Sequence, residues 1–168
     1  MVTRFCPRCY SANAAEAGTC RHCGAALASP AGDDYLAKLV WALHHPEPET
    51  RVRAAELIGR MGKAALPAVA ALVQAYTSAG DPFLRAAVVE ACGSIGGDEA
   101  SELVLKGAAD PSYIVRLSSL AALEKAISTA GEKRKKEMVD MIRHLAKGDP
   151  GSVVREKAAE LINRLGLK

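Results

Sequence analysis

From residue 34 onward, apolar residues recur at spacings of three and four, which is the period of an α-helix with one buried face. The segment RVRAAELIGRMG, beginning at Arg51, aligns without gaps with REKAAELINRLG, beginning at Arg155. Weaker copies begin at Arg85 and Arg116, so the leading arginines lie 34, 31 and 39 residues apart. A repeat of this length indicates a solenoid in which each unit is a pair of helices.

Each copy predicts a second helix whose apolar face is buried. The third, fourth, seventh and tenth residues after the arginine lie on one helical face and are mostly apolar. They are Ala54, Ala55, Ile58 and Met61; Val88, Val89, Cys92 and Ile95; Ser119, Leu120, Leu123 and Ala126; and Ala158, Ala159, Ile162 and Leu165. First helices are predicted over residues 34–45, 64–79, 98–108 and 132–147. Cys92 is expected to be a small buried residue and not a nucleophile.

A turn that contains proline precedes each copy. His45-Pro46, Asp110-Pro111 and Asp149-Pro150 each place the proline five residues before the arginine, whereas Asp81-Pro82 lies two residues closer to Arg85. Proline suits the first position of a helix, and aspartate suits the cap before it. We therefore expect each turn to begin a second helix.

This arrangement resembles the HEAT-repeat family, in which an Asp-Pro turn leads into a second helix that opens with Val-Arg. The matching dipeptides are Thr50-Arg51, Leu84-Arg85, Val115-Arg116 and Val154-Arg155. The likeness covers residues 34–168 and implies an all-α fold, a right-handed α-solenoid of about four HEAT-like helix pairs. It also implies that Asp110 and Asp149 hydrogen-bond with the arginine row, a pattern from which His45 and the shortened Asp81 turn depart.

Four of the five cysteines lie near the N-terminus as two Cys-x-x-Cys motifs with ten residues between them. Two residues between cysteines let a tight turn direct both sulfurs at one ion, and two such turns complete a tetrahedron. Four protein ligands leave no coordination position open, so we predict one structural Zn²⁺ bound by Cys6, Cys9, Cys20 and Cys23. Iron in a rubredoxin-like site and a redox dithiol pair are the alternatives. His22 is expected to face solvent.

The N-terminal segment resembles the short zinc ribbons of many prokaryotic proteins, whose pattern is Cys-Pro-x-Cys, a short spacer and Cys-x-x-Cys-Gly. Tyr10 stands where such ribbons usually carry a second glycine, which indicates a differently shaped first turn. We therefore expect a zinc ribbon over residues 1–25, a linker of small residues over 26–33 and the HEAT-like repeat domain over 34–168.

Composition and charge narrow the function. Hydrophobic residues make up 49% of the chain but aromatic residues only 4%, which suits helices packed on helices. The net charge of +3 is too small to indicate a polyanionic partner. No apolar run approaches the roughly 20 residues of a membrane span or forms a signal peptide. Cysteine pairs spaced for metal are typical of a reducing compartment. We expect a cytoplasmic protein without a membrane partner.

The second helices of a solenoid line its concave surface, which is the usual binding site. Candidate partner-binding residues lie five and nine positions after the arginines and are Glu56, Arg60, Glu90, Lys125, Glu160 and Arg164. Their mixed charge favours a protein partner over nucleic acid. Alternatively, Glu56 with Arg60 and Glu160 with Arg164 only stabilise their own helices. Residues 133–136 form the one dense basic run and are the candidate for binding phosphate or an acidic partner.

The sequence thus predicts a non-enzymatic scaffold or adaptor for protein–protein interaction. No Ser, Cys or second carboxylate is spaced to complete a catalytic set with His44 and His45. One alternative is an accessory protein that binds nucleic acid, because zinc ribbons and some HEAT-like solenoids contact DNA or RNA. Another is a HEAT-like bilin lyase or chromophore-handling protein, because such lyases share these repeats. Tyr35 and Trp41 are six residues apart, so at least one is expected to be partly exposed.

Overall fold

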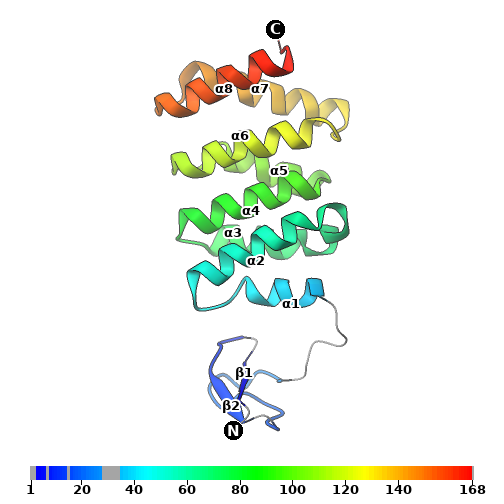
Figure 1. The fold of residues 1–168 in the computed structure, drawn as a ribbon, viewed down its shortest axis with the longest axis vertical. Coiled ribbons are helices and arrows are strands. Elements are labelled where there is room, and N and C mark those ends of the chain that lie inside the picture. Colours follow the sequence, from blue (N-terminus) through cyan, green and yellow to red (C-terminus); the bar gives the residue numbers. More distant parts are fainter. Residues whose placement is uncertain (1–2, 7, 15, 28–34, 168) are drawn as a thin grey trace.

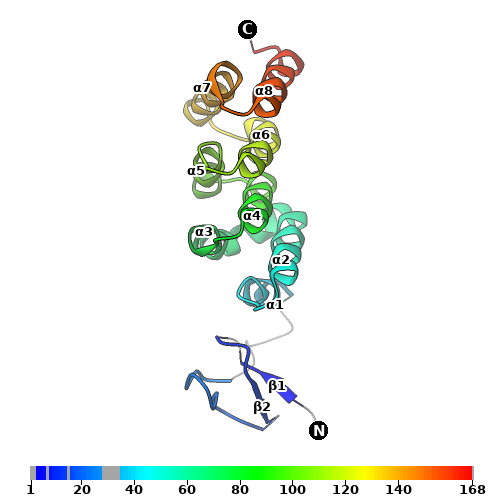
Figure 2. The same cartoon turned by 90° about the vertical axis from the view of Figure 1, so that its left-hand side faces the viewer.

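A computed structural model describes residues 3–6, 8–14, 16–27 and 35–167 of the chain. A small module with two short strands lies at one end, and a stack of helices extends away from it (Figure 1). The second helix of each pair lies on one side of the stack, and the first helices lie on the other (Figure 2). The all-α solenoid predicted from the repeats is confirmed.

The helices occur as four successive pairs in the described part of the chain. The first helices are α1 (Tyr35–Ala42), the 3₁₀ segment η1 (Gly62–Ala68) continued by α3 (Val69–Ser78), α5 (Asp98–Gly107) and α7 (Glu132–Gly148). The second helices are α2 (Pro48–Arg60), α4 (Pro82–Ile95), α6 (Tyr113–Ile127) and α8 (Ser152–Leu165). Each first helix agrees with its predicted range to within a few residues, because the 3.6-residue period of the buried face fixes where it lies.

The predicted apolar stripes form the core of the stack. They are buried in α4 and α6, and in α2 they are buried except for the partly exposed Met61. Cys92 has no exposed surface, and burial raises the pKa of its thiol to about 12, as expected for an unreactive core cysteine. On α8, Ala158 is buried but Ala159 is exposed, because no described helix packs beyond α8.

The turns before α6 and α8 differ from the prediction that proline begins each second helix. At α4 the prediction holds, because Pro82 is the first residue and the Asp81 carboxylate accepts a hydrogen bond from the backbone N–H of Phe83 at 2.9 Å. At α6 and α8 the helix begins two residues after the proline. Asp110 and Asp149 there accept from the backbone N–H two residues onward, at 2.8 Å in each case. These aspartates close the turn because an arginine of the preceding repeat also holds them.

Arginine–aspartate pairs connect successive repeats. Nε and Nη2 of Arg85 donate to the two carboxylate oxygens of Asp110 at 2.8 and 3.0 Å. Arg116 donates to Asp149 in the same way at 2.7 and 3.0 Å. The hydrogen bonds implied by the HEAT resemblance are therefore present for both aspartates. Among the described residues the first repeat lacks this connection, because Asp81 caps α4 and the buried Nε of Arg51 has no hydrogen-bond partner there.

Successive second helices approach through residues without large side chains. A Cβ added at Gly59 on α2 would lie 2.8 Å from Cα of Ala91 on α4. A Cβ added at Gly93 on α4 would lie 2.6 Å from Cα of Ala122 on α6. Neither glycine position has room for a side chain, so α2, α4 and α6 pack backbone to backbone.

Replacing Gly93 with alanine should lower the free energy of unfolding by about 1–3 kcal/mol, the cost of overpacking a tight contact. The matched control is Gly148→Ala at the end of α7, where an added Cβ meets nothing within 4 Å. That variant should be neutral or slightly stabilising. Urea unfolding followed by circular dichroism measures both, and equal losses would contradict the close approach of α4 and α6.

Replacing Asp149 with asparagine should lower the free energy of unfolding by about 2–4 kcal/mol at pH 7, because Arg116 would keep its buried charge without a carboxylate. The control is Asp140→Asn, whose 3.5 Å pair with Arg143 is exposed and contributes about 0.5 kcal/mol or less. Thermal or urea unfolding compares the two variants. Equal effects would show that the buried pair does not connect the repeats.

The same pair predicts a pH dependence. Arg116 holds the pKa of the Asp149 carboxyl below its ordinary value. Stabilisation by the pair is therefore complete above the unfolded-state pKa of about 3.9 and is lost as the pH falls through the lower folded-state pKa. The difference in stability between the wild-type protein and Asp149→Asn should shrink in strong acid and remain constant between about pH 6 and 8.

Candidate metal centre and interhelix groove

The N-terminal module places its two Cys-x-x-Cys turns against each other. Strand β1 (Thr3–Phe5) pairs antiparallel with β2 (Ala12–Ala14). The backbone N–H of Tyr10 closes the first turn by donating to the carbonyl of Cys6 at 2.9 Å, and that of Gly24 closes the second by donating to Cys20 at 2.9 Å. Tyr10 and Gly24 occupy equivalent positions and both have positive φ, 56° and 69°.

The four cysteine sulfurs form one cluster. All lie within 4.8 Å of one another, and the pairs Cys6–Cys23 and Cys9–Cys20 are each 3.6 Å apart. Four sulfurs at about 2.3 Å from a central metal have edges of about 3.8 Å, whereas a disulfide bond measures about 2.05 Å. All four cysteines are free thiols. The donor set therefore fits one tetrahedrally coordinated metal ion.

Hydrogen-bond donors surround the sulfurs and favour thiolates. The backbone N–H groups of Arg8 and His22 each donate to a cysteine sulfur at 3.3 Å. The Ser11 hydroxyl, 3.1 Å from the sulfur of Cys20, lowers the pKa of that thiol to about 5. The Ala25 backbone lowers the pKa of Cys23, but burial and the neighbouring sulfurs outweigh it and raise that pKa to about 12. A bound cation would stabilise all four sulfurs as thiolates.

The module extends two residues beyond the predicted boundary at residue 25. Thr19 forms a β-bridge with Ala26, and Leu27 is 1% exposed in a small core with Cys6 and Cys20. The chain leaving the second turn pairs back onto the module, which the composition of the predicted linker did not indicate. The remainder of that linker, residues 28–33, lies outside the described residues. The His22 side chain is exposed and is not part of the sulfur cluster.

Tyr10 connects the module to the solenoid. Its ring stacks on Trp41 with centroids 5.3 Å apart and an angle of 7° between the planes, and it meets His45 edge to face at 4.6 Å. Its hydroxyl donates to the backbone carbonyl of Trp41 at 2.7 Å. The sequence prediction missed this contact, and its one signal was a tyrosine at a usual glycine position. Tyr35 is 53% exposed, as expected for one of the two aromatic residues of α1.

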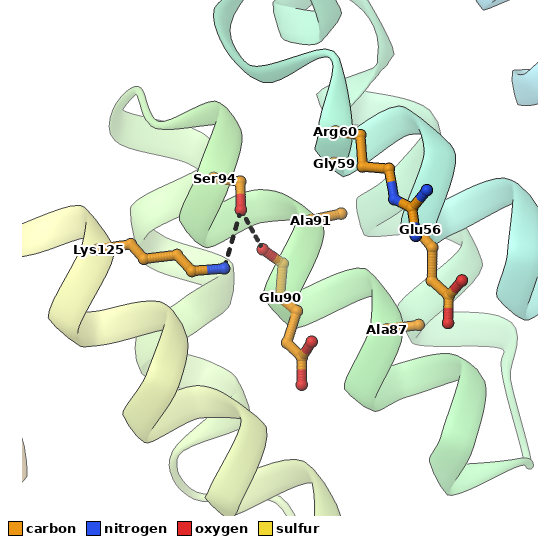
Figure 3. A pocket seen from close by; sticks show the side chains of 8 residues that line it. All are labelled: Glu56, Gly59, Arg60, Ala87, Glu90, Ala91, Ser94 and Lys125. Atoms are coloured by element: carbon orange, nitrogen blue, oxygen red, sulfur yellow. Dashed lines mark hydrogen bonds between the residues drawn. The ribbon is translucent and has the colours of Figure 1, made fainter.

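A second feature is a hollow of about 340 Å³ between α2, α4 and α6, here called the interhelix groove. Small residues from α2 and α4 form its floor: Gly59, Ala87 and Ala91. Polar side chains form its walls: Glu56, Arg60, Glu90, Ser94 and Lys125. Figure 3 shows Arg60 and Glu56 on α2, with Lys125 reaching toward Ser94 from α6. The groove exists because the floor residues carry almost no side chain.

The charged groups of the groove are only partly paired. Glu56 forms an exposed ion pair with Arg53 at 3.0 Å. Glu90 accepts a hydrogen bond from the Ser118 hydroxyl at 2.6 Å, and Lys125 donates to Ser94 at 3.4 Å. In the described ranges, Arg60 makes no hydrogen bond or ion pair through its side chain. Two cationic and two anionic groups therefore face solvent at one place.

The structure gathers four of the six candidate partner-binding residues at this groove: Glu56, Arg60, Glu90 and Lys125. The other two lie on α8 in ion pairs, Glu160 with Lys157 at 2.9 Å and Arg164 with Glu124 of α6 at 2.7 Å. No ion pair joins Glu56 to Arg60 or Glu160 to Arg164 among the described side chains. The predicted pairing within each helix is therefore absent there, because Glu56, Glu160 and Arg164 pair with other residues. A binding role for all six residues stays a prediction.

Comparison with known proteins agrees with the fold. A family profile of HEAT repeats matches residues 36–124. Among solved structures, the complex of CpcE and CpcF of phycocyanin lyase from Nostoc sp. PCC7120 is similar, with a TM-score of 0.53 at 13% sequence identity. The similarity covers 75% of this chain and 96% of that chain, and at this identity it shows the fold alone. A comparison with curated proteins gives no significant match. No helix of the described residues has the length and apolar character needed to cross a membrane.

Proposed function

Because this chain belongs to the HEAT-repeat family, we propose that it is a non-enzymatic scaffold whose interhelix groove binds a segment of a partner protein. The observation that carries the proposal is the groove itself. It spans helices from three successive repeats, and Arg60 keeps its hydrogen-bonding capacity there. Surfaces formed by stacked repeats are the usual binding sites of solenoids.

The charge of the groove favours protein over nucleic acid. A phosphate backbone gains affinity from cationic contacts, and Glu56 and Glu90 would repel it. A protein segment with side chains of both signs can pair with Arg60 and Lys125 on one side and with the carboxylates on the other. The small floor residues let such a segment approach the helix backbones closely.

Two alternative functions have less support. The likeness to the CpcE–CpcF complex suggests handling of a bilin, but a shared fold does not carry a shared activity. Nucleic-acid binding would draw on the basic run at the start of α7, where Arg134 is already paired with Glu137 at 2.8 Å. Neither alternative accounts for the mixed charges of the groove.

We further propose that the metal ion is Zn²⁺ and that its role is structural. Tetrahedral sites of four cysteines are typical of structural zinc, which lacks redox chemistry. The small core around Cys6, Cys20 and Leu27 is too limited to fold the module without metal. Binding free energy at such a site acts as folding free energy.

The zinc proposal predicts one zinc ion per purified chain, measured by inductively coupled plasma mass spectrometry. Cys20→Ser should lose the zinc, and the matched control Cys92→Ala should keep it, because Cys92 lies in the solenoid core. A strong chelator should unfold the module while most of the helical circular dichroism remains. Iron in place of zinc, or full zinc content in Cys20→Ser, would contradict the assignment.

The scaffold proposal predicts that charge reversal in the groove abolishes partner binding. The test variant is Arg60→Glu with Lys125→Glu, and the control is Lys133→Glu with Lys136→Glu on α7, which changes the net charge equally. Nuclease-treated extracts of the native host provide the partner, identified by affinity capture with the wild-type chain. Binding should fall at least about tenfold for the groove variant only. Loss in the α7 variant alone would move the site to the basic run.

A further inference from the structure

We propose that the metal centre acts through Tyr10 as a metal-dependent cap on the first helix pair of the solenoid. With the metal bound, the first cysteine turn holds Tyr10 against Trp41 and His45. Without it, the turn loosens, the ring leaves α1 and the first pair loses its cover. The inference rests on metal binding by the four cysteines and is independent of the interhelix groove.

The position of Tyr10 ties it to the metal. It directly follows Cys9, and its backbone N–H closes the turn by donating to the carbonyl of Cys6. Both cysteines must point at one ion for this turn to persist, because in such a small module the metal supplies much of the folding energy. The orientation of the Tyr10 ring toward α1 therefore depends on metal coordination by Cys6 and Cys9.

The docked arrangement includes two unfavourable features. Tyr10 has a φ of 56°, a left-handed conformation that a bulky residue adopts at a cost. In the described structure the Trp41 indole N–H is buried without a hydrogen-bond partner, which is also costly. The stacking, the edge contact with His45 and the 2.7 Å hydrogen bond to Trp41 oppose these costs. A near balance of this kind makes docking sensitive to whether the metal preforms the turn.

Tyr10 packs on the first helix pair, which has fewer stabilising contacts of its own than the later pairs. Helix α1 has eight residues, too few to be stable alone. In the part of the chain that the structure describes, the first pair also lacks the arginine–aspartate link present between later repeats, because the Nε of Arg51 has no partner there. The Tyr10 hydroxyl donates to the Trp41 carbonyl in the last turn of α1, a carbonyl that also accepts from the backbone N–H of His44 at 3.1 Å. Loss of the cap should therefore loosen α1 and α2 before other helices.

The test uses Tyr10→Gly in the full chain. Glycine adopts positive φ without strain, as Gly24 does in the second turn, so the variant should bind metal at least as well as the wild-type protein. Tyr10→Phe is the control, because it keeps the ring and the strained backbone and removes only the hydroxyl. Thiolate-to-cobalt absorption with Co²⁺ reports metal binding, and emission from Trp41, the only tryptophan, reports docking.

In the wild-type protein and in Tyr10→Phe, chelation should shift the Trp41 emission maximum, and Zn²⁺ should restore it. In Tyr10→Gly the emission should match that of the metal-free wild-type protein and stay unchanged by metal. Amide hydrogen exchange in α1 and α2 should become at least about tenfold faster on chelation of the wild-type protein only. The proposal would be overturned if the Trp41 emission maximum of the wild-type protein did not change with metal. It would also be overturned if that of Tyr10→Gly did change. Absence of cobalt–thiolate absorption would overturn the metal site and the cap together.

Discussion

Gly59 and Gly93 carry no side chain, and this lets α2 approach α4 and α4 approach α6 to backbone contact. Gly59 also forms the floor of the interhelix groove with Ala87 and Ala91, so the packing of α2 on α4 and the candidate binding surface have one cause. At the contact between α6 and α8, the equivalent positions carry Glu124 and Leu161. There an ion pair between α6 and α8 replaces the close contact, and the groove does not continue.

The arginine–aspartate pairs each link a repeat to the one that follows it in the sequence. Each arginine binds carbonyls of its own turn and the carboxylate of the next repeat, as Arg116 does with Pro111 and Asp149. Buried pairs of this kind fix register as well as adding stability. Within the described ranges the first repeat has no such link, and the N-terminal cysteine module contacts that end of the stack. The two domains thus meet at the repeat that lacks the described arginine–aspartate pair.

The sequence was sufficient for features set by local geometry. Helical period alone located the four pairs, and the Cys-x-x-Cys spacing alone indicated the sulfur cluster, because both depend on short stretches of backbone. Other features that depend on distant partners were missed, although the resemblance to HEAT repeats implied the bonds of Asp110 and Asp149 to the arginine row. Arg164 pairs with Glu124 forty residues away, and Tyr10 meets Trp41 across the predicted linker. Only the tyrosine at a glycine position signalled the last of these.

We propose that the interhelix groove is the surface that binds a partner protein. Photo-crosslinking in the native host tests it directly, with a photoreactive phenylalanine at Ser94 in the groove or at Gln74, which is exposed on α3 on the other side of the stack. We expect covalent adducts with a protein from Ser94 and none from Gln74. Adducts from Gln74 alone, or adducts from Ser94 that contain nucleic acid and no protein, would contradict it.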